Sequence, residues 1–398
     1  MNFVICTYDF PPENGAEAFC SARFASALAR AGHHIHVVTV DHSVAISDIS
    51  YQELVDPRII ITRVSKVIKS RTLSIFYRIR YLTVDYNARY IPKLIKATKE
   101  VLSQYEDPIL ISRYSPECSH IAAYYCKNLA FKWIAHFSDP FPNIAIENTI
   151  RERVRYLVQK RWGKKFIFHA DKISITCNNV RRFFETTYGK RYNMKVVLAT
   201  HIGYPMLSSM GFQIQKKENQ FVVSHTGTFF YERYAKYIIE ELKLFSVIHK
   251  GILFIQYGPI CPRVKSLFNA SLPFEWQIRE INDPRCCSDI FEQSDVNLVA
   301  DLRAPLEYSP FLPSKFVYAV FSNRPVVCVS CGDSEMAKFA NQYGEGVFFA
   351  DGSVVGDLND KLESIYNNPK QSASQLLRSN FVGEKVAADF VSCVVSRE

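Results

Sequence analysis

The chain has 398 residues, 48% of them hydrophobic, and a formal net charge of +9. This length is too great for one ordinary domain and suits two, and the composition excludes a disordered, collagen-like or disulfide-stapled protein. The charge is uneven, because residues 1–200 contain 29 Lys+Arg and 17 Asp+Glu whereas residues 201–398 contain 19 and 22. A basic first half predicts an anionic partner.

Short apolar runs alternate with stretches of helical periodicity in the first half of the chain. A strand over residues 3–6, a helix over 16–30 that Gly32 ends, and a strand over 35–40 form a βαβ unit, which implies a parallel sheet. The pattern then repeats, with predicted strands over 109–111, 133–135, 173–175 and 196–198 and helices over 120–129 and 179–188.

A second series of βα units starts near residue 221. It has predicted strands over 221–225, 251–256, 296–299 and 326–329, with a helix over 234–249 after the first of them. Two such series predict an α/β protein of two Rossmann-like domains. We place the N-terminal domain at residues 1–205, the C-terminal domain at 206–370, and a helical segment at 371–398 that packs back on the N-terminal domain. Residues 206–219 are polar and lack periodicity, as a linker does.

Five sequence blocks occur in the order expected for one enzyme family. They are Tyr8–Ala16, Trp133–Pro140, His169–Tyr204, His225–Arg233 and Pro310–Val327. Together they resemble the family 4 type of glycosyltransferase with the GT-B fold, over nearly the whole chain. The resemblance implies two Rossmann-like domains whose parallel sheets face each other across a cleft. It also implies that a nucleotide-sugar donor binds the second domain and a saccharide acceptor binds the first.

Residues of the first domain follow from the same resemblance. Asn14, Gly15 and Ala16 would line the cleft from the loop that opens the first helix, where a glycine lets a backbone approach a ligand. His136 ends a predicted strand, and in the family a histidine there lies near the donor sugar; Asp139 follows it. The alternatives are an ordinary βα turn and a structural histidine.

Residues of the second domain would hold the donor. Gly227 and Thr228 form a glycine turn that would offer backbone N–H groups to a diphosphate, and Arg233 and Lys315 would neutralise the departing charge. Ser314 would cap the helix that begins at Lys315. The other predicted donor contacts are Glu307, Ser309 and Leu312. A solvated arginine at a helix start is the alternative for Arg233.

The sequence departs from the family pattern at two positions. Many members carry two glutamates eight residues apart in the last block, the second of which holds the ribose hydroxyls; here these positions are Ser309 and Val317. Glu307 is a substitute for the first. This departure keeps two other functions open: a nucleotide-sugar epimerase of the same fold, and a catalytically degenerate binding or scaffold protein.

The sequence contains no Asp-x-Asp motif, which metal-dependent transferases of the other main fold use, so we expect metal-independent transfer without a cofactor. Retention of anomeric configuration, a lipid-linked saccharide acceptor and a role in cell-surface polysaccharide synthesis are implied by the resemblance alone. No pair of carboxylates with a hydrolase-like context is present.

Two segments combine positive charge with bulky apolar residues. Residues 63–80 contain basic residues and no acidic one, and residues 151–165 contain one acidic residue, Glu152. Such segments suit an anionic membrane surface, although a solvated face over the sheet is the alternative. No nucleic-acid-binding motif accompanies the charge. Without a signal peptide, a membrane span or a disulfide pattern, we expect a cytoplasmic protein at the inner face of a membrane.

Overall fold

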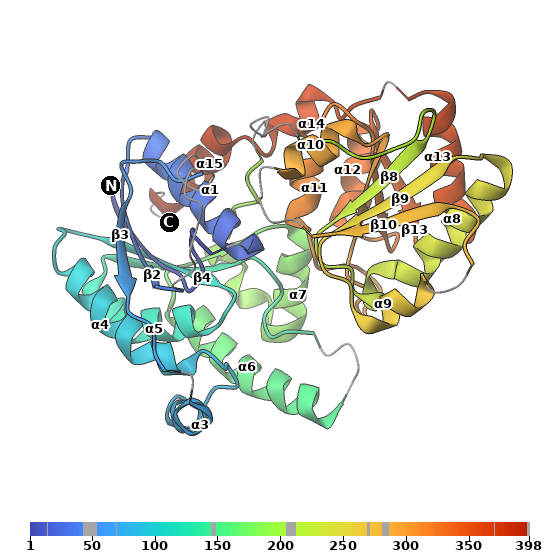
Figure 1. The fold of residues 1–398 in the computed structure, drawn as a ribbon. Helices are drawn as coiled ribbons and strands as arrows, with labels where there is room; N and C mark the ends of the chain where they lie inside the picture. The colour runs from blue at the N-terminus through green and yellow to red at the C-terminus, as the bar shows by residue number, and fades with distance from the viewer. Residues whose placement is uncertain are drawn as a thin grey trace. The chain divides into compact units, whose positions relative to one another are not determined.

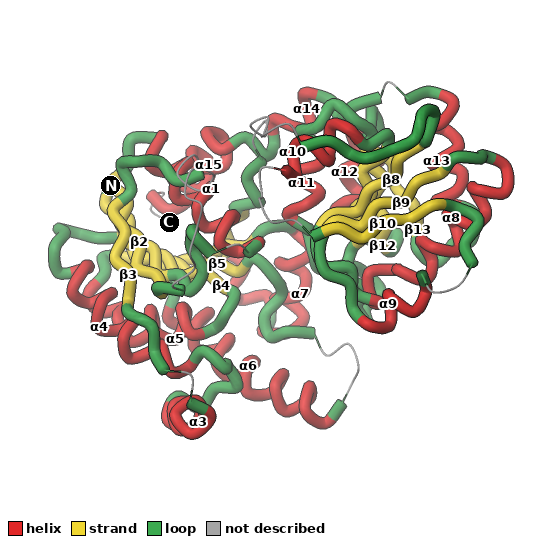
Figure 2. Tube along the Cα trace, in the orientation of Figure 1, coloured by secondary structure: helices red, strands yellow, loops and turns green. Residues whose placement is uncertain are grey.

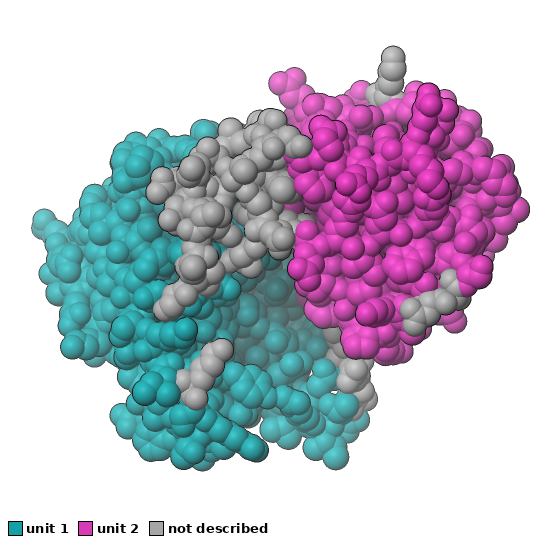
Figure 3. All heavy atoms as spheres, in the orientation of Figure 1, with its two compact units in different colours: residues 1–202, 383–398 teal, residues 203–382 magenta. Residues whose placement is uncertain are grey.

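A computed structural model of the chain describes residues 1–13, 15–42, 54–68, 70–144, 149–203, 212–268, 271–280, 286–369 and 371–395. The chain divides into two compact units, which Figure 3 colours separately. Unit 1 contains residues 1–202 and 383–398, and unit 2 contains residues 203–382. Asn14, Lys69 and residues 206–211 of the predicted linker lie outside the described residues.

Unit 1 is built on a parallel sheet of seven strands in the order β3-β2-β1-β4-β5-β6-β7 (Figure 2). The strands are β1 (Asn2–Cys6), β2 (His34–Val40), β3 (Ile60–Val64), β4 (Ile109–Tyr114), β5 (Lys132–Phe137), β6 (Lys172–Ile175) and β7 (Val196–Leu198). Residues Phe3–Cys6 and the whole of β4 are buried, because a parallel sheet carries helices on both faces. All the strands predicted in this half are confirmed, whereas β3 was not predicted.

The helices of unit 1 cover both faces of this sheet (Figure 1). They are α1 (Ala16–Arg30), α3 (Arg71–Arg80), α4 (Ile91–Leu102), α5 (Cys118–Cys126), α6 (Ile150–His169), α7 (Asn178–Tyr188) and α15 (Gly383–Val395). Helix α1 has the predicted bounds. Helix α15 packs on it, with the Phe390 ring 5.0 Å from the Phe24 ring, and Lys132 donates a hydrogen bond of 2.7 Å to the Val394 carbonyl. The C-terminal helix is therefore part of the unit 1 core.

Unit 2 has a second parallel sheet, of six strands in the order β10-β9-β8-β11-β12-β13. The strands are β8 (Phe221–Thr226), β9 (Ile252–Tyr257), β10 (Glu275–Arg279), β11 (Val296–Ala300), β12 (Val326–Ser330) and β13 (Val347–Asp351). The helices are α8 (Lys236–Ile248), α9 (Pro262–Leu267), α10 (Cys286–Gln293), α11 (Ser314–Ala319), α12 (Glu335–Tyr343), α13 (Asp357–Asn367) and α14 (Gln375–Ser379). The core between the sheet and α8, α9 and α13 is rich in phenylalanine. The two parallel sheets with their helices confirm the predicted α/β class.

None of the helices in the described part of the chain combines the length and the apolar character that spanning a bilayer requires.

Candidate functional site

The strand order of unit 2 marks one place where a ligand is expected. Strands β8 and β11 are neighbours, and the chain leaves β8 toward β9 and β10 but leaves β11 toward β12 and β13. Ligands of such doubly wound sheets bind at this switch point, beyond the carboxyl ends of the strands. Gly227 follows β8 and Asp301 follows β11, so these two turns frame the candidate site.

Gly227 makes room for a lysine side chain. Its φ is +89°, and a Cβ at this position would lie 1.9 Å from Nζ and 2.1 Å from Cε of Lys315. Its N–H donates a hydrogen bond of 2.6 Å to the Tyr257 carbonyl. That N–H is therefore already bonded, which corrects the expectation that it is offered to a diphosphate. The glycine instead lets the Lys315 ammonium lie against the backbone of the turn.

Lys315 lies in the first turn of α11 and is half-buried. Among the described residues, its ammonium has neither a hydrogen bond nor an ion pair. Burial and, to a smaller extent, the positive charge of Arg233 together lower the Lys315 pKa to about 7. A partly desolvated cation without a protein counter-ion is suited to receive an anionic ligand.

Arg233 reaches the same switch point from an irregular turn. The segment Tyr231–Ala235 is a π-helical turn in which Arg233 and Tyr234 have non-helical backbone angles, with φ of Tyr234 at +56°. Gly352 admits the Tyr234 ring, because a Cβ there would lie 2.2 Å from Cδ1 of that ring. Arg233 Nη1 then donates a hydrogen bond of 2.8 Å to the Ala300 carbonyl at the end of β11. Arg233 and Lys315 are thus within electrostatic reach of each other, as predicted for one site.

A buried histidine and glutamine support the glycine turn. The Gln256 amide donates to the Gly227 carbonyl at 2.6 Å, and its Oε1 lies 2.7 Å from Nδ1 of His225. An amide oxygen only accepts, so His225 carries its proton on Nδ1. Burial and the charge of Lys315 hold the His225 pKa well below its usual range, so the ring stays neutral beside the two cations. Neither residue was among the predicted site residues.

A buried carboxylate occupies the other turn of the switch point. Asp301 accepts hydrogen bonds from the hydroxyl groups of Ser309 and Ser330 and from the Leu302 amide, the last two at 2.8 and 2.7 Å. Burial raises the Asp301 pKa to about 6. Ser309 is 2% exposed and is used in this network, so its predicted contact with the donor is corrected to a structural role.

The remaining predicted donor contacts are scattered. Leu312 is buried in unit 2, Glu307 is exposed on its loop, and Thr228 is half-buried beside Gly227. Ser314 is the first residue of α11 and makes no capping hydrogen bond; Pro313 holds the N-cap position, so the predicted cap is wrong. Val317 is fully buried.

Unit 1 has its own switch point, between β1 and β4. Gly15 is the N-cap of α1 with φ at −150°, and open space surrounds the position of its missing Cβ. Ala16 is exposed beside it. No backbone constraint therefore requires a glycine at position 15, and the surface there is free for a ligand.

A carboxylate that the sequence analysis missed lies in the first turn of α1. The Ser138 hydroxyl is 3.0 Å from Oε2 of Glu17, and Asp139 follows on an exposed loop. Burial raises the Glu17 pKa to about 8, and the Asp139 charge acts in the same direction, while Arg113 opposes them. The site offers two carboxylates and a serine hydroxyl at the carboxyl edge of the sheet, which are groups that bind sugar hydroxyls.

His136 lies deeper than predicted. It is 2% exposed, its ring stacks on Phe24 of α1 with centroids 5.8 Å apart, and its Nδ1 is 2.8 Å from the Ser174 hydroxyl. Burial and the charge of Arg113 hold the His136 pKa well below its usual range. The expectation of a histidine that faces the donor is corrected, because β5 is covered by α1 at this point.

Among the described residues, no group of three His, Cys, Asp or Glu side chains is arranged to hold a metal ion.

Solved structures of the same fold extend over nearly the full length of the chain. A TarM variant from S. aureus, solved with Fondaparinux, alpha-GlcNAc-glycerol and UDP, has a TM-score of 0.68 at 10% identity and covers 100% of both chains. HepE from Anabaena, solved with UDP and glucose, has a TM-score of 0.67 at 11% identity and also covers 100% of both. A glycosyltransferase from Rickettsia africae has a TM-score of 0.59 at 13% identity, over 98% of this chain and 93% of its own.

These comparisons confirm the GT-B fold of nucleotide-sugar glycosyltransferases. No model of a protein family matches the sequence, and no curated protein sequence matches it.

Proposed function

We propose that this chain is a glycosyltransferase that moves a sugar from a nucleoside diphosphate sugar to a saccharide. The observation that carries the proposal is the Lys315 ammonium, which lies against Gly227 at the switch point of unit 2 and is joined there by Arg233. The fold supports it, since TarM and HepE share it and were both solved with UDP. Uridine diphosphate is therefore the first donor nucleotide to test.

The proposed reaction requires no covalent bond between the protein and the sugar. The nucleoside diphosphate is a fair leaving group. The bond from the sugar carbon to its phosphate oxygen breaks, the bond to the acceptor oxygen forms, and the proton of the acceptor hydroxyl passes to the departing diphosphate. Lys315 and Arg233 stabilise the negative charge that grows on the diphosphate, which is the task of a metal in other transferases. His225 remains neutral and adds no third charge to the turn. We infer metal-independent transfer from this arrangement, and retention of configuration from the sequence resemblance alone.

The acceptor side belongs to unit 1. Glu17 and Asp139 provide hydrogen-bonding groups for sugar hydroxyls. With a pKa of about 8, the Glu17 carboxyl is largely protonated at neutral pH and can donate a hydrogen bond as well as accept one. A lipid-linked saccharide is the proposed acceptor, and assembly of a cell-surface polysaccharide at the inner face of the membrane is the proposed setting. The basic and apolar surface of unit 1 supports this choice.

The test is a panel of labelled nucleotide sugars incubated with the protein and an extract of lipid-linked saccharides. We expect label to enter the lipid fraction only with the correct donor, and free nucleoside diphosphate to appear in equal amount. An isomerised nucleotide sugar formed without acceptor would establish an epimerase instead. Failure of every nucleoside diphosphate to raise the thermal unfolding midpoint would leave only a scaffold role.

Binding to anionic membranes should depend on exposed arginines of α3. Replacing Arg71 and Arg80 with glutamate removes about 1 kcal/mol of attraction per site and adds repulsion. The partition coefficient onto vesicles that contain about one third phosphatidylserine should therefore fall at least tenfold. Reversing Lys250 and Lys265, which are exposed in unit 2, changes the net charge equally and should have little effect. Equal losses in both variants would show that net charge alone drives the binding.

A further inference from the structure

Helix α3 is an unusual element of unit 1, because none of its residues is buried. Its apolar side chains are open to solvent, with Phe76 53% and Ile79 68% exposed. On α6, Ile150, Val154 and Leu157 are also exposed, and their spacing places them on one face of the helix. Two neighbouring helices thus present apolar stripes that the fold leaves uncovered, and such a surface marks a binding site.

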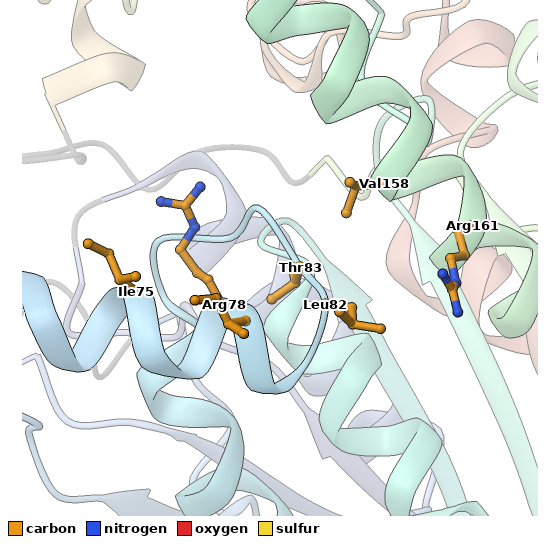
Figure 4. A pocket seen from close by; sticks show the side chains of 7 residues that line it. Ile75, Arg78, Leu82, Thr83, Val158 and Arg161 are labelled. Atoms are coloured by element: carbon orange, nitrogen blue, oxygen red, sulfur yellow. The ribbon is translucent and has the colours of Figure 1, made fainter.

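Helices α3 and α6 both line a pocket of about 400 Å³ (Figure 4). Its lining consists of apolar side chains and two arginines: Ile75, Arg78, Ile79, Leu82, Thr83, Val158 and Arg161. Figure 4 shows Leu82 and Thr83 between Arg78 of α3 and Val158 and Arg161 of α6. The volume is within the range of sites that bind small ligands.

The floor of the pocket is fixed by the core. The Trp162 indole is 2% exposed, and its N–H is 3.1 Å from the Tyr81 carbonyl and 3.0 Å from the Leu82 carbonyl. This bond ties the end of α3 to the middle of α6. Thr83 is buried below, and its amide donates to the Arg78 carbonyl at 2.9 Å. The backbone at Leu82 and Thr83, on the floor of the pocket, is therefore held in place by the core.

The charge around the pocket favours an anion. Within the described residues, neither Arg78 nor Arg161 has an ion pair. The Arg78 guanidinium lies 4.9 Å from the centre of the Tyr86 ring, and its charge opposes the rise that burial causes in the pKa of Asp85. Helix α3 has no acidic residue, and Glu152, the acidic residue of α6, pairs with Arg155 at 3.4 Å. A largely apolar pocket beside two guanidinium groups that form no ion pair among the described residues complements a molecule with a hydrocarbon chain and a phosphate.

We propose that the pocket between α3 and α6 binds the lipid part of the acceptor: the first segment of a hydrocarbon chain lies against Ile75, Ile79, Leu82 and Val158, and its phosphate or diphosphate lies beside Arg78 and Arg161. This inference rests on the proposed transfer to a lipid-linked saccharide and assigns the place where that lipid is held. The exposed stripes around the pocket contact the membrane from which the chain enters.

The test uses farnesyl diphosphate, a soluble isoprenoid diphosphate, below its micellar concentration and with the full chain. Calorimetry should give a dissociation constant at least tenfold lower than that of inorganic diphosphate, because the chain adds apolar contact. Ile79→Asp and Arg161→Ala should each raise the dissociation constant of farnesyl diphosphate at least fivefold. The matched controls are Leu157→Asp and Arg153→Ala, which alter exposed residues of α6 outside the pocket lining and should change the constant less than twofold.

Three results would overturn the inference. In the first, farnesyl diphosphate and inorganic diphosphate have equal dissociation constants. In the second, the pocket variants bind farnesyl diphosphate as tightly as their controls do. In the third, Ile79→Asp weakens vesicle binding but not farnesyl diphosphate binding, which would make the stripes a general membrane contact. UDP binding by the same preparations keeps the two proposals separate. If the protein binds UDP but not farnesyl diphosphate, the proposed pocket is refuted. If it binds farnesyl diphosphate but not UDP, the proposed function of unit 2 is refuted. An unchanged thermal unfolding midpoint for each variant verifies its fold.

Discussion

Lys315→Ala is expected to lower kcat/KM for the nucleotide sugar at least tenfold, a loss of about 1.4 kcal/mol of transition-state stabilisation. The ammonium is held against the glycine turn without a counter-ion among the described residues, so its removal leaves the growing diphosphate charge to Arg233 alone. The matched control is Lys338→Ala, because Lys338 is exposed in unit 2 and pairs with Asp333 and Glu335. If the Lys315 variant is as active as the control, Lys315 does not contribute to the site.

The pH dependence gives the same prediction an independent readout. A Lys315 pKa of about 7 means that the side chain is charged below pH 7 and loses its charge above it. UDP affinity should therefore fall between pH 7 and pH 9 and approach that of the alanine variant, which should stay flat over this range. The effect on stability has the opposite sign. An unfolded lysine titrates near ~10.4, so the unfolded chain binds more protons from about pH 7 to that value, and the contribution of Lys315 to stability rises with pH through this window.

The central strands were predictable because they lie between two layers of helices. A strand that is buried on both faces has a continuous apolar run, as in Phe3–Cys6 and Ile252–Tyr257. The three strands that the sequence analysis missed, β3, β10 and β13, lie at sheet edges. Their side chains are partly exposed, and β3 and β10 mix charged and apolar residues, which leaves no clear run. β13 does have a short apolar run, Val347–Ala350, which the prediction did not include.

Arg233 and Lys315 could be proposed for one site from the sequence because Arg233 follows a glycine turn and Lys315 follows a Pro-rich block, in the order expected from the family resemblance. Their supports could not be predicted in this way. Gln256 reaches back 31 residues to His225, and Ser330 binds Asp301 from 29 residues away. Such pairs are created by strand order, which a sequence pattern does not specify. Ser309 differs, because its partner Asp301 lies only eight residues earlier on the same loop; the sequence pattern does not show that this hydroxyl binds a buried carboxylate.

His136 and Glu17 show where position along a strand or helix is insufficient. His136 is next to the last residue of β5, a place that normally faces a ligand, but Phe24 of α1 covers it. Glu17 lies in the first turn of α1, where an acidic residue is an ordinary feature of a helix start. Its functional character comes from burial beside Ser138 and Asp139, which only the tertiary structure brings together.

Gly227→Ala should separate the activity of the site from the stability of unit 2. A methyl group there would lie 1.9 Å from Nζ and 2.1 Å from Cε of Lys315. The methyl group clashes with the end of the flexible Lys315 side chain, so the side chain adopts another rotamer. The Lys315 ammonium then no longer lies against the glycine turn. The φ of +89° adds about 1 kcal/mol of strain for alanine, which corresponds to roughly 2–4 °C in the unfolding midpoint. We expect this modest loss of stability together with a loss of kcat/KM similar to that of Lys315→Ala.

Gly356→Ala is the matched control for this change. Gly356 has a φ of +90° and no atom within 4 Å of the added Cβ, so its variant reproduces the backbone strain without the clash. It should lose stability to a similar extent and keep its activity. In the double variant of Gly227 and Lys315 the methyl group has no ammonium to displace, so kcat/KM should fall no further than in Lys315→Ala. Additive losses would mean that Gly227 acts on the donor by a route other than the position of Lys315.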